Sequence, residues 1–459
     1  MEYNLSIGGD HYEELKKHLY PGDGNEAVAL ALCGYRETNS FLKFTIYKIH
    51  VIPYSECIIR KPDLINWKTN SIIPLLIEAE KYGLSILKIH SHPTGFPNFS
   101  ETDDKSDLEL FSSVYGWIEH KRPHMSAIML PSGEIFGRII HNSLKSSPIH
   151  KIAIAGKEFK IWFNNKDISN VDEFSLRTSQ AFGEQTIQIL KNMKICIVGC
   201  SGTGSPTIEQ LVRLGIGEIV LIDPDKVEIK NLNRIINTRR IDAEKGRYKT
   251  EVLKERIEKI GLGTIVKSLP VNFIGNKDAL NEIISSDFVF GCMDSIDGRH
   301  YLNNICNFYI IPYYDLGVKL KSNGKGGIEY ILSSFNYIEP GKSSLLARGV
   351  YTDMELKSAN MKRNNPLEYI EQKKMNYMVD VDLNSPAVIS VNMVISSLAV
   401  CDFLDRIHTF RTGNKEEYDV TRVSLHDWYI QNHKDTNVDY YSPKFMGRGD
   451  MEPFLNLQE

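Results

Sequence analysis

The chain has 459 residues, of which 42% are apolar and 24% charged, and its formal net charge is −4. This length exceeds one ordinary hydrophobic core and predicts a soluble globular protein of two domains. A charge so close to neutral argues against nucleic acid as the main partner, because phosphate binding needs a basic face. The longest apolar runs are far shorter than a membrane span.

The seven cysteines lie mostly inside apolar runs, and they form no C-x-x-C pair. That usage is typical of a reducing compartment, in which a buried cysteine behaves as a small hydrophobic residue. The first four residues lack the basic and then apolar pattern of a signal peptide. We therefore expect a cytoplasmic protein.

The first 145 residues are expected to form an α/β domain. Short apolar runs bounded by Gly, Asp or Pro favour strands, and helical apolar spacing favours helices. The expected elements are strands at 27–33, 44–52 and 84–89, helices at 72–82 and 103–118, and a hairpin of strands at 126–130 and 134–140. Thr102 or Ser100 can cap the second helix. Residues 146–170, with short strands and polar turns, are interpreted as a linker or docking segment.

Strands and helices alternate in the domain expected at 171–459. This alternation is typical of a doubly wound parallel sheet. Beyond Pro340 the pattern loosens until an apolar helix. The expected elements are strands at 194–198, 219–222 and 288–290 and helices at 174–190, 205–214, 244–260, 298–308 and 386–403.

Two histidines follow the strand expected at 84–89, and Asp103 comes 11 residues after the second, His92. His90 and His92 are two residues apart, so they face the same side of an extended segment. Two imidazoles and a carboxylate suit zinc and leave a position for water. Such a metal beside a general base hydrolyses amides. The competing interpretation is a polar loop rich in turn residues.

The same stretch resembles the JAMM (MPN+) metalloprotease family over about the first 145 residues. The family pattern is His-x-His-Pro, six residues, Ser, two residues and Asp, and every position is matched. The resemblance implies a JAB1/MPN-type α/β domain in which His90, His92 and Asp103 hold zinc. It also implies that Glu26 takes a proton from the bound water and that Ser100 hydrogen-bonds the developing oxyanion. Glu26 could instead be a surface turn residue.

A second group of motifs begins with the glycine-rich segment 199–204, placed between an expected strand and a helix. Alone, it indicates phosphates at a helix N-terminus. More specific runs follow at 223–228, 231–234, 246–249 and 291–294, namely DPDKVE, NLNR, GRYK and GCMD. Together they resemble the ThiF/MoeB superfamily, which includes the ubiquitin-activating enzymes, over about residues 174–410. The competing interpretation is a generic dinucleotide site.

ATP and Mg²⁺ are the ligands that this second resemblance implies. Asp223 ends a strand, where a carboxylate can accept hydrogen bonds from ribose hydroxyls. Arg234 and Lys249 match residues that neutralise the triphosphate as pyrophosphate leaves, and Asp294 matches the magnesium ligand. Asn231 is expected to contact phosphate or magnesium. The remaining nucleotide-binding residues are expected to be Gly199, Gly202, Gly204 and Asp225.

Arg177 matches an arginine that reaches the γ-phosphate across a dimer in this superfamily, which implies a two-fold homodimer. Many relatives also carry C-x-x-C pairs that hold a structural zinc, but Ser344 and Ala347 stand where such cysteines are expected. No cysteine lies between 341 and 385, where thioester-forming relatives need one. Cys292 and Cys401 are interpreted as structural.

The leading hypothesis is an enzyme with two active sites, belonging to bacterial ubiquitin-like pathways of the kind linked to antiviral defence. One domain would cleave after a ubiquitin-like C-terminus, and the other would adenylate that carboxylate with ATP. The expected partners are a ubiquitin-like protein with a Gly-terminal tail and a conjugating enzyme, with no nucleic acid and no membrane. Two alternatives stay open: a nucleotide- and partner-binding scaffold, and adenylation of a peptide or metabolite in natural-product synthesis.

Overall fold

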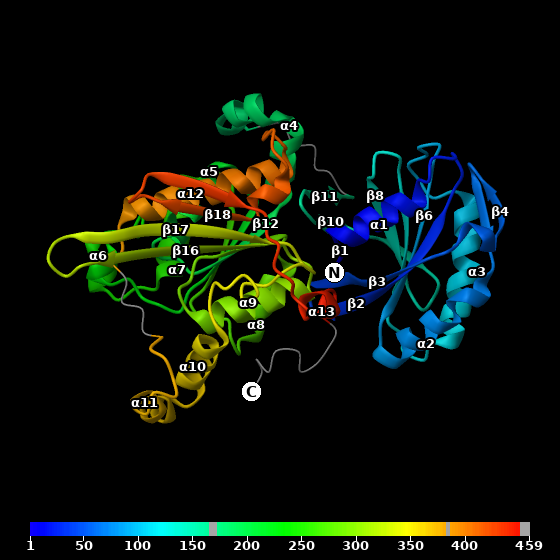
Figure 1. Cartoon of the computed structure of the whole chain (residues 1–459). Coiled ribbons are helices and arrows are strands. Elements are labelled where there is room, and N and C mark those ends of the chain that lie inside the picture. Colours follow the sequence, from blue (N-terminus) through cyan, green and yellow to red (C-terminus); the bar gives the residue numbers. More distant parts are fainter. Residues whose placement is uncertain (165–171, 382–385, 450–459) are drawn as a thin grey trace. The chain divides into compact units, whose positions relative to one another are not determined.

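The computed structural model describes residues 1–164, 172–381 and 386–449 (Figure 1). These residues form two compact units: 1–164 group with 308–310 and 445–449, and the other described residues form the second unit. Residues 146–163, interpreted from sequence as linker, instead supply three strands of the first unit's sheet. The rest of that expected linker, 165–170, lies outside the described residues.

The first unit is built on a nine-stranded mixed sheet with the order β11-β10-β1-β3-β2-β6-β7-β8-β9. A separate hairpin, β4–β5, lies outside it. The expected hairpin near Gly133 is present as the antiparallel pair of β7 and β8. The strands are β1 (Glu2–Gly8), β2 (Val28–Glu37), β3 (Phe41–Val51), β4 (Cys57–Lys61), β5 (Leu64–Trp67), β6 (Ser85–Ser91), β7 (His124–Met129), β8 (Ile135–Ile140), β9 (Ser146–Pro148), β10 (Lys151–Ala155) and β11 (Phe159–Phe163).

Both faces of this sheet are covered by helices. Alternate residues of β2 point to opposite faces, so Ala29 and Ala31 join one core cluster while Leu30 and Leu32 join another. Helix α1 (Gly9–Leu19) contributes to the first cluster, and α2 (Ile73–Tyr82) and α3 (Glu101–Trp117) to the second. The central strands β2, β6 and β7 are therefore buried along most or all of their length, as expected for a sheet covered on both faces.

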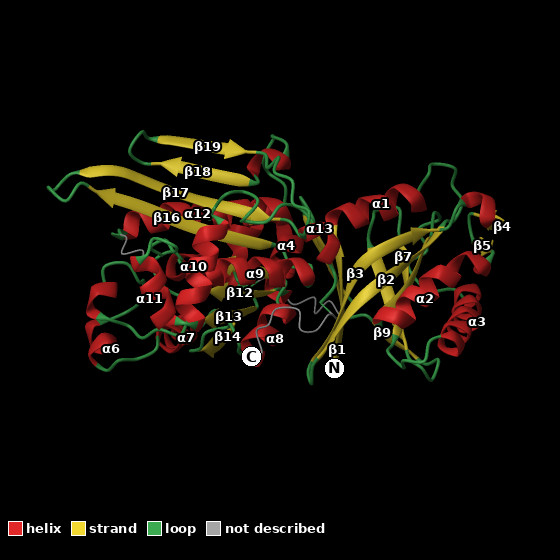
Figure 2. Ribbon diagram, turned by 60° about the horizontal axis from the view of Figure 1, so that its bottom comes forward, coloured by secondary structure: helices red, strands yellow, loops and turns green. Residues whose placement is uncertain are grey.

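The second unit contains an eight-stranded sheet with the order β14-β13-β12-β15-β16-β17-β18-β19. The first five strands in this order are parallel, and β16 to β19 pair antiparallel. The long hairpin of β16 and β17 extends beyond the rest of the sheet (Figure 2). The strands are β12 (Lys194–Val198), β13 (Glu218–Ile222), β14 (Ile265–Leu269), β15 (Phe288–Gly291), β16 (Tyr313–Ser322), β17 (Ile328–Ile338), β18 (Val420–Ser424) and β19 (Tyr429–His433).

The helices of the second unit follow the crossovers of a doubly wound fold, which confirms the expected Rossmann-like architecture. After β12 the chain moves to β13 and β14, and it then returns to place β15 on the other side of β12. Helices α5 and α12 lie together on one face, with α8 and α9 on the other (Figure 1). The helices are α4 (Leu176–Asn192), α5 (Gly204–Arg213), α6 (Arg240–Glu244), α7 (Lys249–Ile260), α8 (Lys277–Ser285), α9 (Ile296–Phe308), α10 (Asp353–Asn364), α11 (Pro366–Lys374), α12 (Ile389–Ile407) and α13 (Ser442–Phe445).

Two helices differ from the expectations. The helix expected at 244–260 is shorter in the structure, because α6 ends at Glu244 and Gly246 takes a positive φ of 58° in the turn that follows. Helix α7 therefore begins at Lys249. Helix α4 is kinked at Gly183, whose φ is 78°. Among the described residues, no helix is both long and apolar enough to cross a membrane.

Candidate functional site

The histidines and aspartate of the first motif converge at the end of β6. His90 is the penultimate residue of β6 and His92 follows the strand, and their Nε2 atoms lie 3.1 Å apart. Asp103 lies in the first turn of α3. Its Oδ1 is 2.8 Å from His90 Nε2, and its Oδ2 is 3.4 Å from His92 Nε2. Two ring nitrogens and one carboxylate thus surround a single point.

A capping box at the start of α3 holds Asp103 in place. The Ser100 hydroxyl accepts a hydrogen bond from the Asp103 backbone N–H at 3.1 Å, and Asp103 Oδ2 accepts from the Ser100 backbone N–H at 2.7 Å. Of the two expected caps, Ser100 is the one used. The same hydroxyl lies 2.7 Å from Asp103 Oδ2 and donates to it. The structure therefore gives Ser100 a role in orienting Asp103, and its contact with an oxyanion stays a prediction.

The hydrogen bond of His92 defines its tautomer. Its Nδ1 lies 2.8 Å from the Phe96 carbonyl oxygen, which can only accept, so Nδ1 carries the proton. Nε2 is therefore the ring nitrogen that faces Asp103 and the one that can bind a metal. Nδ1 of His90 is buried, and no partner for it is present in the parts of the chain that the structure describes.

Glu26 lies just before β2 and is 5% exposed, unlike a surface turn residue. Its Oε1 is 4.0 Å from His92 Nε2. Ligand atoms of Glu26, His90 and His92 all lie within 4.8 Å of one another. Burial raises the pKa of Glu26, His92 opposes this and the nearby Asp103 carboxylate supports it, and together these effects bring the pKa to about 7.

The electrostatics of this group suit a divalent cation. Burial raises the pKa of Asp103, but hydrogen bonds with His90 and His92 outweigh that effect and hold the pKa well below its usual range. Burial lowers the pKa of His90, which favours the neutral imidazole that a metal binds. Burial lowers the pKa of His92, but its hydrogen bonds with Asp103 and the Phe96 carbonyl outweigh that effect and raise it, so a metal would bind His92 by displacing a proton. Two imidazoles and an ionised carboxylate form the donor set of a three-ligand zinc site. The residues present therefore fit the expected metal.

The second group of motif residues lines one cavity of about 600 Å³ at the carboxyl ends of β12, β13 and β15. Ligands of doubly wound sheets bind where the strand order reverses, and β12 occupies that position here. Of the expected nucleotide residues, those that line the cavity are Gly199, Gly202, Asp223, Asp225, Asn231, Arg234, Lys249 and Asp294.

Close backbone packing explains the glycines. A Cβ at Gly204, the first residue of α5, would lie 1.9 Å from the Gly199 carbonyl oxygen. At Gly199 a Cβ would lie 2.6 Å from the Cys292 carbonyl oxygen, and the φ there is 96°. Gly204 is buried and is not part of the cavity lining. It acts by letting the loop close tightly against the start of α5.

Asp223 and Lys249 lie at the ends of two secondary structure elements. Asp223 follows β13 and accepts hydrogen bonds from the backbone N–H groups of Cys200 and Asp225. Lys249 begins α7, and its Nζ lies 2.7 Å from Asp225 Oδ2 and 3.6 Å from Asp223 Oδ1. Burial raises the pKa of Asp223, and the charge of Lys249 opposes this. The ammonium is thus buried at the cavity wall beside carboxylates.

The other expected residues differ in their exposure. Asn231 is buried, and its Oδ1 accepts from the Glu228 backbone N–H at 3.1 Å, which stabilises the local turn. The Arg234 guanidinium donates to the Lys230 carbonyl at 2.9 Å. Asp294 is exposed at the cavity. Arg177 is exposed on α4 and does not line the cavity, so this chain does not bring it to the other residues.

Three residues of the cavity were not identified from the sequence. Arg299 pairs with Asp315 and Arg363 pairs with Asp297, so both guanidinium groups are held at the wall by buried carboxylates. Asn392 reaches the cavity from α12. Its polar side chain beside the buried apolar residues Val391 and Ile395 is the signal that could have identified it.

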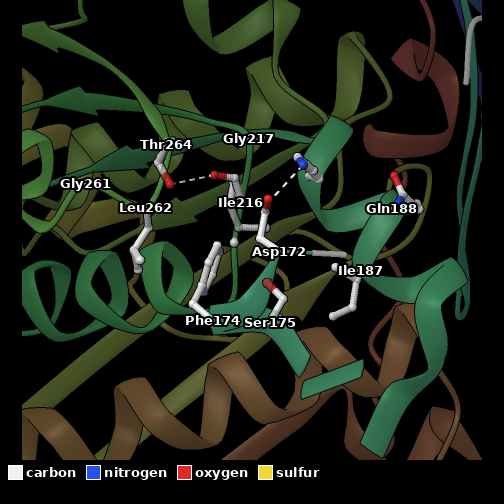
Figure 3. Close-up of a pocket in the computed structure, with 13 residues that line it drawn as sticks. Asp172, Phe174, Ser175, Ile187, Gln188, Ile216, Gly217, Gly261, Leu262 and Thr264 are labelled. Carbon is white, nitrogen blue, oxygen red and sulfur yellow. Dashed lines mark hydrogen bonds and ion pairs between the residues drawn. The ribbon is translucent and has the colours of Figure 1, made fainter. Parts of the chain in front are cut away.

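A different cavity, of about 400 Å³, lies at the amino-terminal ends of β13 and β14 (Figure 3). Phe174, Ile187 and Leu262 contribute to its wall, and Lys191 and Asp172 form an ion pair of 3.0 Å beside it. None of the expected nucleotide residues lines it. Because ligand crevices in such sheets form at the carboxyl ends of the strands, we assign the nucleotide to the cavity at β12.

The ThiF family model matches residues 175–432, and the chain belongs to the ThiF family. This match confirms the ThiF resemblance of the second unit. It does not extend to the first unit, so the metalloprotease resemblance stays a prediction.

Three relatives illustrate the similarity. The chain is 29% identical over 197 residues to adenylyltransferase and sulfurtransferase UBA4 of Meyerozyma guilliermondii, covering 41% of this chain and 44% of that protein. It is 33% identical over 140 residues to tRNA threonylcarbamoyladenosine dehydratase of Escherichia coli, covering 30% and 52%. It is 28% identical over 169 residues to ubiquitin-like modifier-activating enzyme 5 of Drosophila mojavensis, covering 34% and 40%. The matched segments thus span about half of these relatives or less.

Among solved structures, the chain is similar to E. coli MccB with MccA-N7isoASN, at 21% identity and a TM-score of 0.46, covering 60% of this chain and 75% of that one. It is also similar to the microcin C7 biosynthetic enzyme MccB with N-formylated MccA. The identity there is 17% and the TM-score 0.47, covering 91% of this chain and 99% of that one.

Proposed function

We propose that the second unit uses ATP to adenylate the C-terminal carboxylate of a ubiquitin-like protein. The observation that carries this proposal is the convergence of eight expected residues on the cavity at β12. Membership of the ThiF family supports it, as does the similarity to adenylyltransferase and sulfurtransferase UBA4 and to ubiquitin-like modifier-activating enzyme 5. In the reaction, a carboxylate oxygen bonds to the α-phosphorus of ATP, and the bond to pyrophosphate breaks.

The residues of the cavity would have different roles in the reaction according to their charge. The Asp223 carboxylate accepts hydrogen bonds from the ribose hydroxyls and so orients the nucleoside. Arg234 and Lys249 offset the negative charge that moves onto the departing pyrophosphate. Asp294 provides a hard oxygen ligand for Mg²⁺, which when bound disperses phosphate charge. The exposure of Asp294 at the cavity suits that role.

We also propose that the first unit is a zinc peptidase that cleaves after the C-terminus of the same ubiquitin-like protein. Its support is the geometry of His90, His92 and Asp103, in which the donor atoms lie 2.8–3.4 Å apart. Zinc, when bound there, acts as a Lewis acid and activates water. Glu26 would accept the proton of that water, and its burial beside His92 supports this role, while Ser100 holds Asp103 in its orientation.

Joining the two units in one chain has a chemical reason. Cleavage exposes a C-terminal carboxylate, and adenylation consumes a C-terminal carboxylate, so the two reactions share one substrate. This substrate needs a narrow, flexible tail, and a Gly-terminal tail has that property. The first reaction either trims a precursor or removes a conjugate.

The cysteines indicate that the activated carboxylate does not become a thioester on this chain. Cys292 lines the nucleotide cavity, but burial raises the pKa of its thiol to about 12. Cys200, beside it in the glycine-rich loop, is also buried, and its pKa is raised. Cys401, expected from the sequence to be a buried structural residue, is exposed, and partial burial of its thiol still raises the pKa. The acyl adenylate would pass to an external nucleophile, such as a cysteine of a conjugating enzyme.

A homodimer would complete the nucleotide site. Arg177 is exposed and does not line the cavity of its own chain. A second copy could therefore supply it to the γ-phosphate. Arg177→Ala should then lower the activity, and mixing it with an Asp294→Ala variant should restore part of that activity if the two copies exchange arginines.

The test is ATP–pyrophosphate exchange in the presence of ubiquitin-like proteins with a Gly-terminal tail. Exchange should require the protein substrate and should be lost in Asp294→Ala, while Asp278→Ala, which removes an exposed carboxylate from α8, should be normal. Exchange with small carboxylic acids alone would contradict the substrate assignment. Partner binding without exchange in the wild type would identify a scaffold instead.

The peptidase is tested separately by mass spectrometry of the same substrate extended by a few residues. The wild type with zinc should shorten the tail, and Glu26→Ala should not. Glu13→Ala, which removes an exposed carboxylate from α1, is the matched control and should cleave normally. Cleavage by Glu26→Ala at the rate of the wild type would remove Glu26 as the proton acceptor.

A further inference from the structure

Asn392 places a buried amide in the nucleotide cavity without a partner for its donor. The residue lies near the start of α12 and is 3% exposed. Its Nδ2 is buried and has no hydrogen-bond partner in the parts of the chain that the structure describes. An unpaired buried donor destabilises a fold, because the group has lost its hydrogen bonds to water. Such a group calls for a partner outside the chain, such as a bound ligand or a water molecule.

The position of Asn392 is fixed by the next turn of the same helix. Ser396 lies four residues later, on the same face of α12, and its hydroxyl donates to the Thr203 carbonyl at 2.8 Å. Helix α12 also packs along α5, whose first residue is Gly204. The face of α12 that carries Asn392 is therefore fastened to the glycine-rich loop.

The amide lies directly against Gly202. A Cβ built on Gly202 would be 2.5 Å from Asn392 Nδ2 and 3.4 Å from Arg234 Cδ. Gly202 therefore has no side chain at the point where the loop, Asn392 and Arg234 meet. Gly202, Arg234 and Asn392 all line the cavity. A phosphate group bound at this point would therefore contact both the glycine-rich loop and Arg234, the expected phosphate-binding arginine.

We propose that Asn392 is a phosphate-binding residue of this site, whose Nδ2 donates a hydrogen bond to a phosphate oxygen of the bound nucleotide. The inference rests on the proposed function, because it requires ATP in this cavity. Phosphate oxygens only accept hydrogen bonds, so they match a free amide donor. An asparagine also adds a donor without adding charge to a wall that already holds Arg234 and Lys249.

The experiment compares the binding of ATP, AMP and adenosine by calorimetry in the wild type and in Asn392→Ala. ATP affinity should fall about tenfold or more, since hydrogen bonds to charged groups are of that strength. Adenosine, which lacks phosphate, should bind equally to both proteins. Asn392→Asp keeps the shape of the side chain but brings a carboxylate to the phosphates, so it should weaken ATP binding more than Asn392→Ala does.

Asn307→Ala is the matched control. Asn307 is a buried asparagine of the same unit, and both ends of its amide are paired, with the Ser442 carbonyl and the Gly341 N–H. This variant should melt at a lower temperature and bind ATP normally. Asn392→Ala should show the reverse, with a melting temperature of the apo protein that does not fall and a smaller rise on adding ATP.

Three results would overturn the assignment. Unchanged ATP affinity in a folded Asn392→Ala would remove the contact, and an equal loss for ATP and adenosine would move it away from phosphate. A raised KM for the protein substrate with normal ATP affinity would place the amide at the substrate carboxylate instead. If the wild type binds no ATP, the proposed function fails together with this inference. If it binds ATP and the variant matches it, the inference alone fails.

Discussion

Gly204→Ala offers a sharp test of the nucleotide site, because the structure gives the size of the disturbance. The new Cβ would lie 1.9 Å from the Gly199 carbonyl oxygen, where ordinary contact needs about 3.5 Å. The loop must therefore move by roughly 1.5 Å. Hydrogen bonds to phosphate work over about 2.7–3.2 Å, so a shift of this size breaks at least one of them.

The expected loss follows from that displacement. One hydrogen bond to a charged group contributes about 1.5–3 kcal/mol, which corresponds to roughly a 10- to 150-fold weaker affinity for ATP. Overpacking should also lower the free energy of unfolding by about 1–3 kcal/mol. Calorimetric titration with ATP and urea denaturation measure the two effects separately.

Gly116→Ala is the matched control for this substitution. Gly116 also lies in a helix, α3, but a Cβ there would meet nothing within 4 Å. The control should stabilise the protein by about 0.5–1 kcal/mol and leave ATP binding unchanged. If Gly204→Ala binds ATP within twofold of the wild type, the glycine-rich loop does not hold the phosphates and the argument from packing is wrong.

Zinc at 100 times its Kd should raise the free energy of unfolding of the wild type by about 2.7 kcal/mol in urea denaturation. Asp103→Asn should lose this stabilisation, and mass spectrometry should find no bound metal in it. Bound metal in Asp103→Asn would exclude the ligand set of His90, His92 and Asp103. Burial lowers the pKa of His124 to about 3. Because the unfolded imidazole has a pKa near 6.5, the unfolded chain binds one more proton below that pH, so stability falls by about 1.4 kcal/mol per pH unit from 6.5 towards 3. His124→Asn should make urea unfolding less dependent on pH over this range, and an unchanged slope would contradict the buried neutral imidazole. Lys88→Met should destabilise the first unit by up to about 3–5 kcal/mol because it removes one partner of the buried Lys88–Asp107 ion pair, which Arg138 compensates in part. The double variant with Asp107→Leu should recover some of that loss in urea denaturation, and no recovery would show that packing, not charge, sets the cost.

Local patterns were sufficient for the parts of both sites that lie close together in the chain. His90 and His92 share a strand end, and Ser100 and Asp103 share one helical turn, so their spacing alone predicts convergence. The nucleotide residues follow the same rule, because the carboxyl ends of parallel strands meet at one edge. Asp223 was therefore identified from the end of its strand, whereas Lys249 was identified from the GRYK motif, because the helix expected there began at residue 244.

Contacts between segments that are distant in the chain could not be predicted from local sequence patterns. Asn392 reaches Gly202 because α12 packs on α5, and nothing in the local pattern near 392 encodes that neighbour. The segment 146–163 resembles a linker, since short strands show their partners only when the sheet is assembled. The paired carboxylates behind Arg299 and Arg363 likewise come from other elements.

The amino-acid order alone therefore specifies which chemical groups are present and which local elements carry them: a glycine-rich turn after a strand, and imidazoles at a strand end. The assembled fold settles which of those groups meet and in what state. It buries Glu26 beside His92, and it aims the unpaired amide of Asn392 at the loop. The physical reason is that periodicity and capping act over a few residues, whereas burial and packing depend on elements brought together from the whole chain.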